Sequence, residues 1–166
     1  TADNKAFAGS IPENTNFFMS QSAVEHFDED LNFFRKIRDY ILVKNKSVIQ
    51  VHLIPSRSCL RLYGLHGVRQ YTPRTVSKLT SLFHDFSYSV LFGLGGKECN
   101  RLHYEFITRP LAKLRTTDWR EYDEKLYSAI ERDMECLQSE PSFYALVIHS
   151  NGKNELNLGV CGGPEI

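Results

Sequence analysis

The sequence predicts an α+β fold with a mixed or antiparallel sheet, several helices and a C-terminal β-hairpin. Helical and strand patterns occur in the order helix, two strands, helix, strand, two helices and two strands, which is typical of this class. The 166 residues suit one domain, and 42% of them are hydrophobic, so a sizeable core can form. We therefore expect a single domain over 1–166, with flexible ends at 1–15 and 162–166.

The first expected elements are a short edge strand at 17–19 and a long helix at 22–43. Ser22 and Glu25 have the spacing of a capping box, in which the serine caps a free amide and the glutamate reaches back. Apolar residues then recur at helical spacing, at Val24, Phe27, Leu31, Phe34, Ile37 and Ile41.

The next expected elements are two strands, at 48–54 and 59–65, followed by a helix. In the first strand, alternate residues are apolar, and glycines close the second. Pro73 fits the first position of the helix, where its missing amide costs nothing, and Thr72 is the expected cap.

The second half of the chain predicts a strand, two helices and a hairpin. The strand at 88–92 leads into the glycine turn 93–96, and a helix from Lys97 should end at Pro110. A long helix is expected over 118–138. Asn151-Gly152 separates apolar runs at 143–149 and 155–161, which predicts a hairpin because both turn residues need positive φ.

Composition limits the partners and cofactors that the sequence predicts. Twenty Lys and Arg balance twenty Asp and Glu, so the chain as a whole lacks a basic nucleic-acid footprint. No apolar run is long enough for a membrane helix, so no membrane association is expected. No close His/Cys cluster or CxxC pair is present, so we expect no metal and no cofactor. The four Cys are interpreted as free thiols, with one or two disulfides as the alternative.

Three groups of residues were considered for chemistry. The turn Gly93-Leu94-Gly95-Gly96 lacks the third glycine of a dinucleotide fingerprint and the Gly-Lys-Ser/Thr of a P-loop, so it is interpreted as a backbone turn. Glu98 and Arg101 are helical neighbours that form either a surface ion pair or a catalytic pair. The third group sets basic residues beside aromatic ones, a combination that can stack on unpaired bases; it comprises Arg57, Arg61, Arg69, Arg74, Tyr63 and Tyr71.

Several segments together resemble the ribosome-inactivating proteins. Asn16–Ser20 and Leu31–Arg38 look like the opening strand and first helix of that family, and Leu79–Asp85 with Tyr88–Gly96 looks like a later helix, strand and glycine turn. The resemblance covers roughly 16–130. It implies an α+β fold that removes one adenine from ribosomal RNA, with RNA or the ribosome as partner and a secreted or vacuolar location.

The resemblance assigns roles to a few residues only. It makes Tyr63, Tyr71 and Arg61 the substrate-binding candidates, and Glu98 and Arg101 the candidate catalytic pair. The tyrosine expected after the glycine turn is replaced by Lys97-Glu98-Cys99, and no Arg follows Arg132 to supply the family's Glu–Arg helix. The resemblance therefore implies a diverged member with weak or no N-glycosidase activity that retains RNA or ribosome binding.

Two other functions remain open from the residues alone. One is an unrelated α+β module that binds a protein partner without catalysis, which would be cytoplasmic. The other is an enzyme with a different, unrecognised signature.

Overall fold

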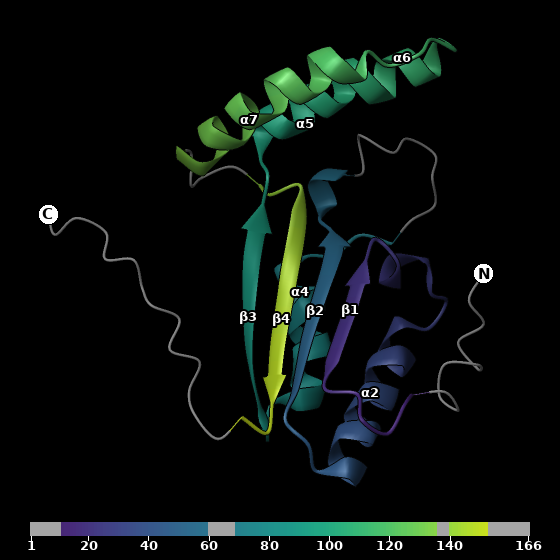
Figure 1. Cartoon of the computed structure of the whole chain (residues 1–166), viewed down its shortest axis with the longest axis vertical. Coiled ribbons are helices and arrows are strands. Elements are labelled where there is room, and N and C mark those ends of the chain that lie inside the picture. Colours follow the sequence, from purple (N-terminus) through teal and green to yellow (C-terminus); the bar gives the residue numbers. More distant parts are fainter. Residues whose placement is uncertain (1–10, 60–68, 136–139, 153–166) are drawn as a thin grey trace, which may run out of the picture.

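The computed structural model describes residues 11–59, 69–135 and 140–152, and its four strands form one mixed sheet (Figure 1). The strand order is β1-β2-β4-β3. β1 is parallel to β2, whereas β4 is antiparallel to both of its neighbours, so β1, β2 and β3 share one direction. The α+β class with a mixed sheet is confirmed. The strands are β1 (Phe17–Gln21), β2 (Val48–Pro55), β3 (Ser87–Leu94) and β4 (Phe143–Ser150).

The helices form two groups around this sheet. The first group, α2 (Asp30–Lys44) and α4 (Pro73–Thr80), packs on one sheet face. The second lies across the carboxyl ends of β1, β2 and β3 (Figure 1) and comprises α5 (Lys97–His103), α6 (Arg109–Ala112) and α7 (Trp119–Glu135). None of the helices in the described ranges is both long and apolar enough to cross a membrane. Short helical turns complete the chain: η1 (Val24–His26), η2 (Arg57–Cys59), η3 (Ser81–Phe83) and η4 (Tyr104–Thr108).

The core lies between the sheet and the first group of helices. Phe34 of α2 is fully buried, and its ring meets the edges of His52 and Phe83 at centroid distances of 4.8 and 6.4 Å. Burial of one such aromatic side chain stabilises a fold by roughly 1.5–3 kcal/mol. The largest fully buried apolar side chains of this core are Tyr71, Phe34, Phe83, Ile37, Ile41, Ile54, Leu146 and Ile148.

The predicted helix at 22–43 is wrong at its start, because the chain turns sharply after β1. Ser22 adopts a left-handed backbone with φ of 45°, and its amide donates to the carbonyl of Leu53 at 3.1 Å. A residue in that conformation cannot begin an α-helix as a capping-box serine, and no side-chain cap precedes the turn η1. The helix proper begins at Asp30 and ends at Asn45, which takes the left-handed conformation common at helix ends.

The caps of two other helices are as predicted. Thr72 caps α4, where its hydroxyl accepts from the Thr75 amide at 3.2 Å. Asp118 caps α7, where its carboxylate accepts from the Glu121 amide at 3.1 Å. Of the strand predicted at 59–65, Cys59 belongs to the turn η2, and 60–65 lies outside the described residues.

Pro110 distorts its helix instead of ending it. Proline has no amide to donate to the carbonyl four residues back, which belongs to Phe106. The backbone widens into the π-helical turn η4 just before α6, and the Thr117 hydroxyl donates to the Phe106 carbonyl at 2.8 Å. A side chain eleven positions later therefore satisfies the carbonyl that the proline left without its helical donor.

The predicted hairpin is described only in its first strand. Phe143–Ser150 forms β4, and Asn151 has a φ of 53°, as its turn position requires. The expected partner at 155–161 lies outside the described residues. Both edges of β4 are paired, one with β2 and the other with β3, so β4 is an inner strand.

Candidate ligand-binding site

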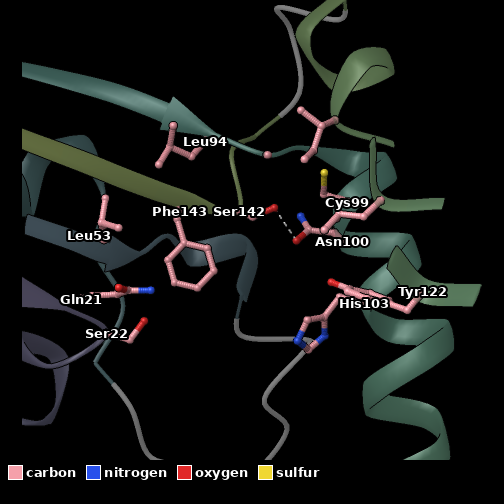
Figure 2. A pocket seen from close by; sticks show the side chains of 13 residues that line it. Gln21, Ser22, Leu53, Leu94, Cys99, Asn100, His103, Tyr122, Ser142 and Phe143 are labelled. Atoms are coloured by element: carbon pink, nitrogen blue, oxygen red, sulfur yellow. Dashed lines mark hydrogen bonds between the residues drawn. The ribbon is translucent and has the colours of Figure 1, made fainter. Parts of the chain in front are cut away.

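A pocket of about 360 Å³ opens where the three strands of common direction end (Figure 2). In open α/β sheets, ligands bind at the carboxyl ends of the strands, and pockets for small molecules start at about 300 Å³. We call this cavity the strand-end pocket. Its lining comes from the ends of β1 to β3, from α5 and α7 and from the start of β4: Gln21, Ser22, Leu53, Leu94, Gly95, Cys99, Asn100, His103, Tyr122, Leu126, Ile130, Ser142 and Phe143.

The glycine turn after β3 shapes one wall of the pocket. Gly95 has a φ of +64°, and a Cβ added to it would lie 2.9 Å from the Ser142 hydroxyl. Both the backbone conformation and the space therefore require glycine there. The turn predicted from Gly93-Leu94-Gly95-Gly96 is present, and it lets α5 start directly above the end of β3.

Ser142 connects three segments behind the pocket. Its hydroxyl donates to the Asn100 side-chain oxygen at 2.7 Å, as Figure 2 shows, and its amide donates to the Leu94 carbonyl at 3.0 Å. Its carbonyl accepts from the Ser56 amide at 3.1 Å and from the Cys59 thiol at 2.6 Å. Because these bonds join α5, β3 and β2, the position of the pocket wall is set by backbone contacts and one buried hydroxyl.

Asp133 of α7 holds the start of α5 in place. Its two carboxylate oxygens accept from the backbone amides of Glu98 and Cys99 at 2.9 and 2.8 Å. A helix leaves its first amides without partners, and a carboxylate there also interacts favourably with the helix dipole. The two helices that close the pocket are thus joined by a charged cap in addition to their side-chain packing.

Among the described residues, the lining of the pocket contains no charged side chain. None of its thirteen lining residues is Asp, Glu, Lys or Arg. Burial lowers the pKa of His103 below its ordinary value of 6.5, and burial raises the pKa of Tyr122 above 10. Burial, with a hydrogen bond to Asp133, raises the pKa of the Cys99 thiol to about 11. The three groups that could carry charge are therefore neutral near pH 7. Asn100 is already bonded to Ser142 and Ser58, and His103 Nδ1 lies 3.3 Å from the Thr108 hydroxyl, so Tyr122 supplies the polar group that faces the pocket.

Comparison with known proteins identifies the fold. No family model matches the chain, and no curated protein matches it. A solved structure, a SAM-dependent methyltransferase from Archaeoglobus fulgidus, aligns with 90% of this chain at a TM-score of 0.50 and 18% identity. The fold is methyltransferase-like. Haemonchus contortus phosphoethanolamine N-methyltransferase 2, in complex with phosphomonomethylethanolamine and S-adenosylhomocysteine, aligns with 86% of the chain at a TM-score of 0.44 and 11% identity.

The chain is shorter than both of these proteins. It spans 66% of the Archaeoglobus fulgidus chain and 35% of the Haemonchus contortus chain. Roughly a third of the first structure therefore has no counterpart in the alignment.

The resemblance to ribosome-inactivating proteins is wrong. The structural match is to a methyltransferase fold over 90% of the chain, not to an adenine-removing toxin. The expected N-glycosidase function falls with it, as do the toxin and hydrolase classes. The short motifs behind the resemblance describe a helix, a strand and a glycine turn, and those elements do exist here, as α4, β3 and the turn at 93–96. They occur in many folds, so they do not distinguish one fold from another.

Of the residues that the resemblance singled out, those within the described ranges do not line the strand-end pocket, and the others lie outside those ranges. Tyr71 is buried in the core, where its hydroxyl donates to Asp30 at 2.9 Å, and burial raises its pKa well above 10. Glu98 and Arg101 form an ion pair at 3.2 Å on α5, and Arg101 also pairs with Glu105 at 3.1 Å. Neither Glu98 nor Arg101 lines the pocket. Arg61 and Tyr63 lie outside the described residues.

Sequence reasoning did not select the residues that form the pocket. Asn100 and His103 belong to α5, Tyr122 belongs to α7 and Ser142 directly precedes β4, and none of the four forms a motif with a neighbour. One signal was available: Gln21-Ser22 and the glycine turn each follow a strand pattern, where ligand sites of α/β sheets occur.

The sequence predicts no metal site and free thiols at the four cysteines. Over the described ranges, no group of three or more His, Cys, Asp and Glu could hold a metal ion. Cys59 and Cys99 are free thiols in the structure, while Cys136 and Cys161 lie outside the described residues.

Proposed function

We propose that this domain binds a neutral, largely apolar small molecule in the strand-end pocket, and that this molecule belongs to the methyl-acceptor side of a methyltransferase-like protein. The observation that carries the proposal is the pocket itself. It measures about 360 Å³, lies at the carboxyl ends of three strands of one direction, and is closed by two helices. The fold likeness to a SAM-dependent methyltransferase supports the choice of reaction class.

The chemistry of the lining favours an uncharged ligand. Burying an ion without a partner costs far more than burying an apolar group, and the lining supplies no counter-ion. Leu53, Leu126 and Ile130 provide apolar surface, and Phe143 provides an aromatic ring. The hydroxyl of Tyr122 would then orient a hydroxyl or carbonyl of the ligand. Small neutral phenols fit this description.

The residues of this pocket do not fit S-adenosylmethionine. That molecule carries a sulfonium, an ammonium and a carboxylate group, together with a ribose diol that proteins commonly bind through Asp or Glu. No acid among residues 11–59, 69–135 and 140–152 lines the pocket, and the nearby Asp133 is already bound to the first amides of α5. We therefore assign the pocket to the acceptor class of molecule and derive no step through the methyl donor.

The fluorescence of Trp119 gives a direct binding assay. It is the chain's single tryptophan, and its ring meets that of the lining residue Tyr122 at a centroid distance of 5.9 Å. Titration with catechol, p-cresol or indole should change this fluorescence in a saturable way. Guaiacol, the methylated form of catechol, should compete for the same site, because an acceptor pocket must also hold the methylated product. S-adenosylmethionine should give no saturable change.

A matched pair of variants locates the binding. Leu126→Phe places a larger ring in the pocket and should weaken phenol binding roughly tenfold. Met134→Phe introduces the same ring on the same helix at a side chain that is 74% exposed and outside the pocket, so affinity should stay at the parent value. Saturable binding of S-adenosylmethionine that Leu126→Phe abolishes would refute the assignment, and so would equal effects of the two variants.

A further inference from the structure

In the part of the chain that the structure describes, no helix or strand covers the sheet face opposite the one that α2 and α4 cover (Figure 1). Strand register places four rows of side chains on it. The exposed members are large and apolar, and six of them have exposed fractions between 39 and 58%. We call this surface the open face and define it by Phe17, Met19, Ile49, Tyr88, Phe92 and Leu94, with Val51, Val90 and Val147 between them.

The four strands contain no charged side chain of the Asp, Glu, Lys or Arg type. A solvent-facing antiparallel sheet normally alternates apolar and polar residues, whereas a sheet buried on both faces is apolar throughout. Gln21 and His149 are the polar side chains among the residues whose register places them on the open face. The sequence of the strands is thus that of a sheet covered on both sides.

From these observations we propose that the open face packs against the same face of a second copy of this chain. A two-fold interface brings the same surface of both copies together, so a net charge on that surface would be repelled by the net charge of its copy. The open face avoids this repulsion because its strands carry no Lys, Arg, Asp or Glu. The whole chain has a formal net charge of zero, which also removes long-range repulsion between copies.

The size of the face meets the needs of a dimer. The three strands of eight residues are roughly 27 Å long, β1 with five residues is roughly 17 Å long, and each strand is roughly 4.8 Å wide, which gives roughly 470 Å² of sheet per copy. Two copies would bury roughly 1,000 Å², the lower limit for a specific interface. Packed sheets lie about 10 Å apart with interdigitating side chains, and the rings of Phe17, Tyr88 and Phe92 have the size to fill that space.

Mass measurement on the 166-residue chain tests this proposal. Sedimentation equilibrium from low to high micromolar concentration should show a monomer–dimer equilibrium. The double variant Met19→Glu/Phe92→Glu adds charges to the face at side chains that are 58 and 44% exposed, and neither lines the strand-end pocket. It should weaken dimerisation on the order of 100-fold or more, because the charges would be buried without partners. The control is Val43→Glu, at a residue of α2 that is 80% exposed and lies outside the open face. It should dimerise like the parent.

A second measurement covers the case in which the double variant fails to fold. In the parent protein, the methyl signals of Val51 and Val147, at the centre of the face, should shift with protein concentration, while those of Val43 should not. A chain that stays monomeric at every concentration overturns the proposal and leaves the face to another partner or segment. So does a dimer in which Val51 and Val147 do not shift, because that dimer uses another surface.

Discussion

His52 should make the stability of this protein fall sharply in mild acid. Its ring is buried in the core against Phe33 and Phe34, at centroid distances of 6.0 and 4.8 Å. Ser20 Oγ lies 2.8 Å from Nδ1, and Gln50 Oε1 lies 3.3 Å from Nε2. Burial lowers the pKa of His52 from 6.5 to about 4, because a charged imidazolium would lose its hydration there.

The magnitude follows from that change in pKa. The unfolded chain binds a proton at His52 below pH 6.5, whereas the folded chain does so only below about pH 4. The stabilisation is therefore complete above pH 6.5 and is lost as the pH falls toward 4. At about 1.4 kcal/mol per pKa unit, the loss amounts to about 3 kcal/mol. Glu25 acts in the opposite direction, because burial raises the pKa of its carboxyl and favours the fold in acid.

A difference between variants isolates the histidine from Glu25. Urea unfolding should be followed from pH 7.5 to pH 4 for the parent, His52→Gln and His84→Gln. Glutamine can still hydrogen-bond to Ser20 and Gln50 but cannot titrate, so the parent should lose about 3 kcal/mol more than His52→Gln across this range. His84, whose side chain is 72% exposed, is the control for removal of a histidine, and its variant should follow the parent. Parallel pH curves for the parent and His52→Gln would show that the buried ring is not the cause.

Three further changes test contacts near the site and in the core. Asp133→Ala removes the acceptor of two α5 amides and should lower the free energy of unfolding by about 1–2 kcal/mol, measured in urea, with phenol binding weakened as α5 loosens. Gly95→Ala places a Cβ 2.9 Å from the Ser142 hydroxyl at a φ of +64° and should cost at least about 1–2 kcal/mol; a neutral result in thermal unfolding would contradict that geometry. Tyr71→Phe loses one hydrogen bond to Asp30 and should destabilise by about 1 kcal/mol without changing the Trp119 titration, since Tyr71 does not line the pocket.

The local elements were predictable where the sequence carries a local cause. Thr72-Pro73 marks the start of α4 and Asp118 the start of α7, because each cap acts within its own four residues. The predicted start of the helix at 22–43 was wrong because a distant contact, and not the local sequence, fixes Ser22. Ser22 has the right neighbours for a capping box, but its amide is bound to Leu53 of another strand, and that contact fixes its backbone. A bond between residues 31 positions apart cannot be read from a short pattern.

The pocket was not predictable from motifs, because its residues meet through the strand order. Tyr122 reaches the pocket from α7, while Ser142 directly precedes the strand that inserts between β2 and β3. The sequence shows each residue as an ordinary member of a helix or strand. The informative feature of a pocket residue is its position at the end of a strand. Once β1, β2 and β3 are known to run in one direction, this position identifies Gln21, Ser22 and Gly95 as pocket residues.

The composition of the strands also carries more information than their pattern did. Alternation places Ile49, Val51 and Leu53 on one face of the strand. In the structure that face is the open one, and the covered face carries Val48, Gln50, His52 and Ile54. The alternation was therefore real, but its polar members are the buried ones. Gln50 and His52 are fully buried and bonded to each other, while the apolar set faces outward. Apolar residues on the outward face of β2 are explained if that face is covered as well. This is the reason to look for a second surface that packs against the open face of the sheet.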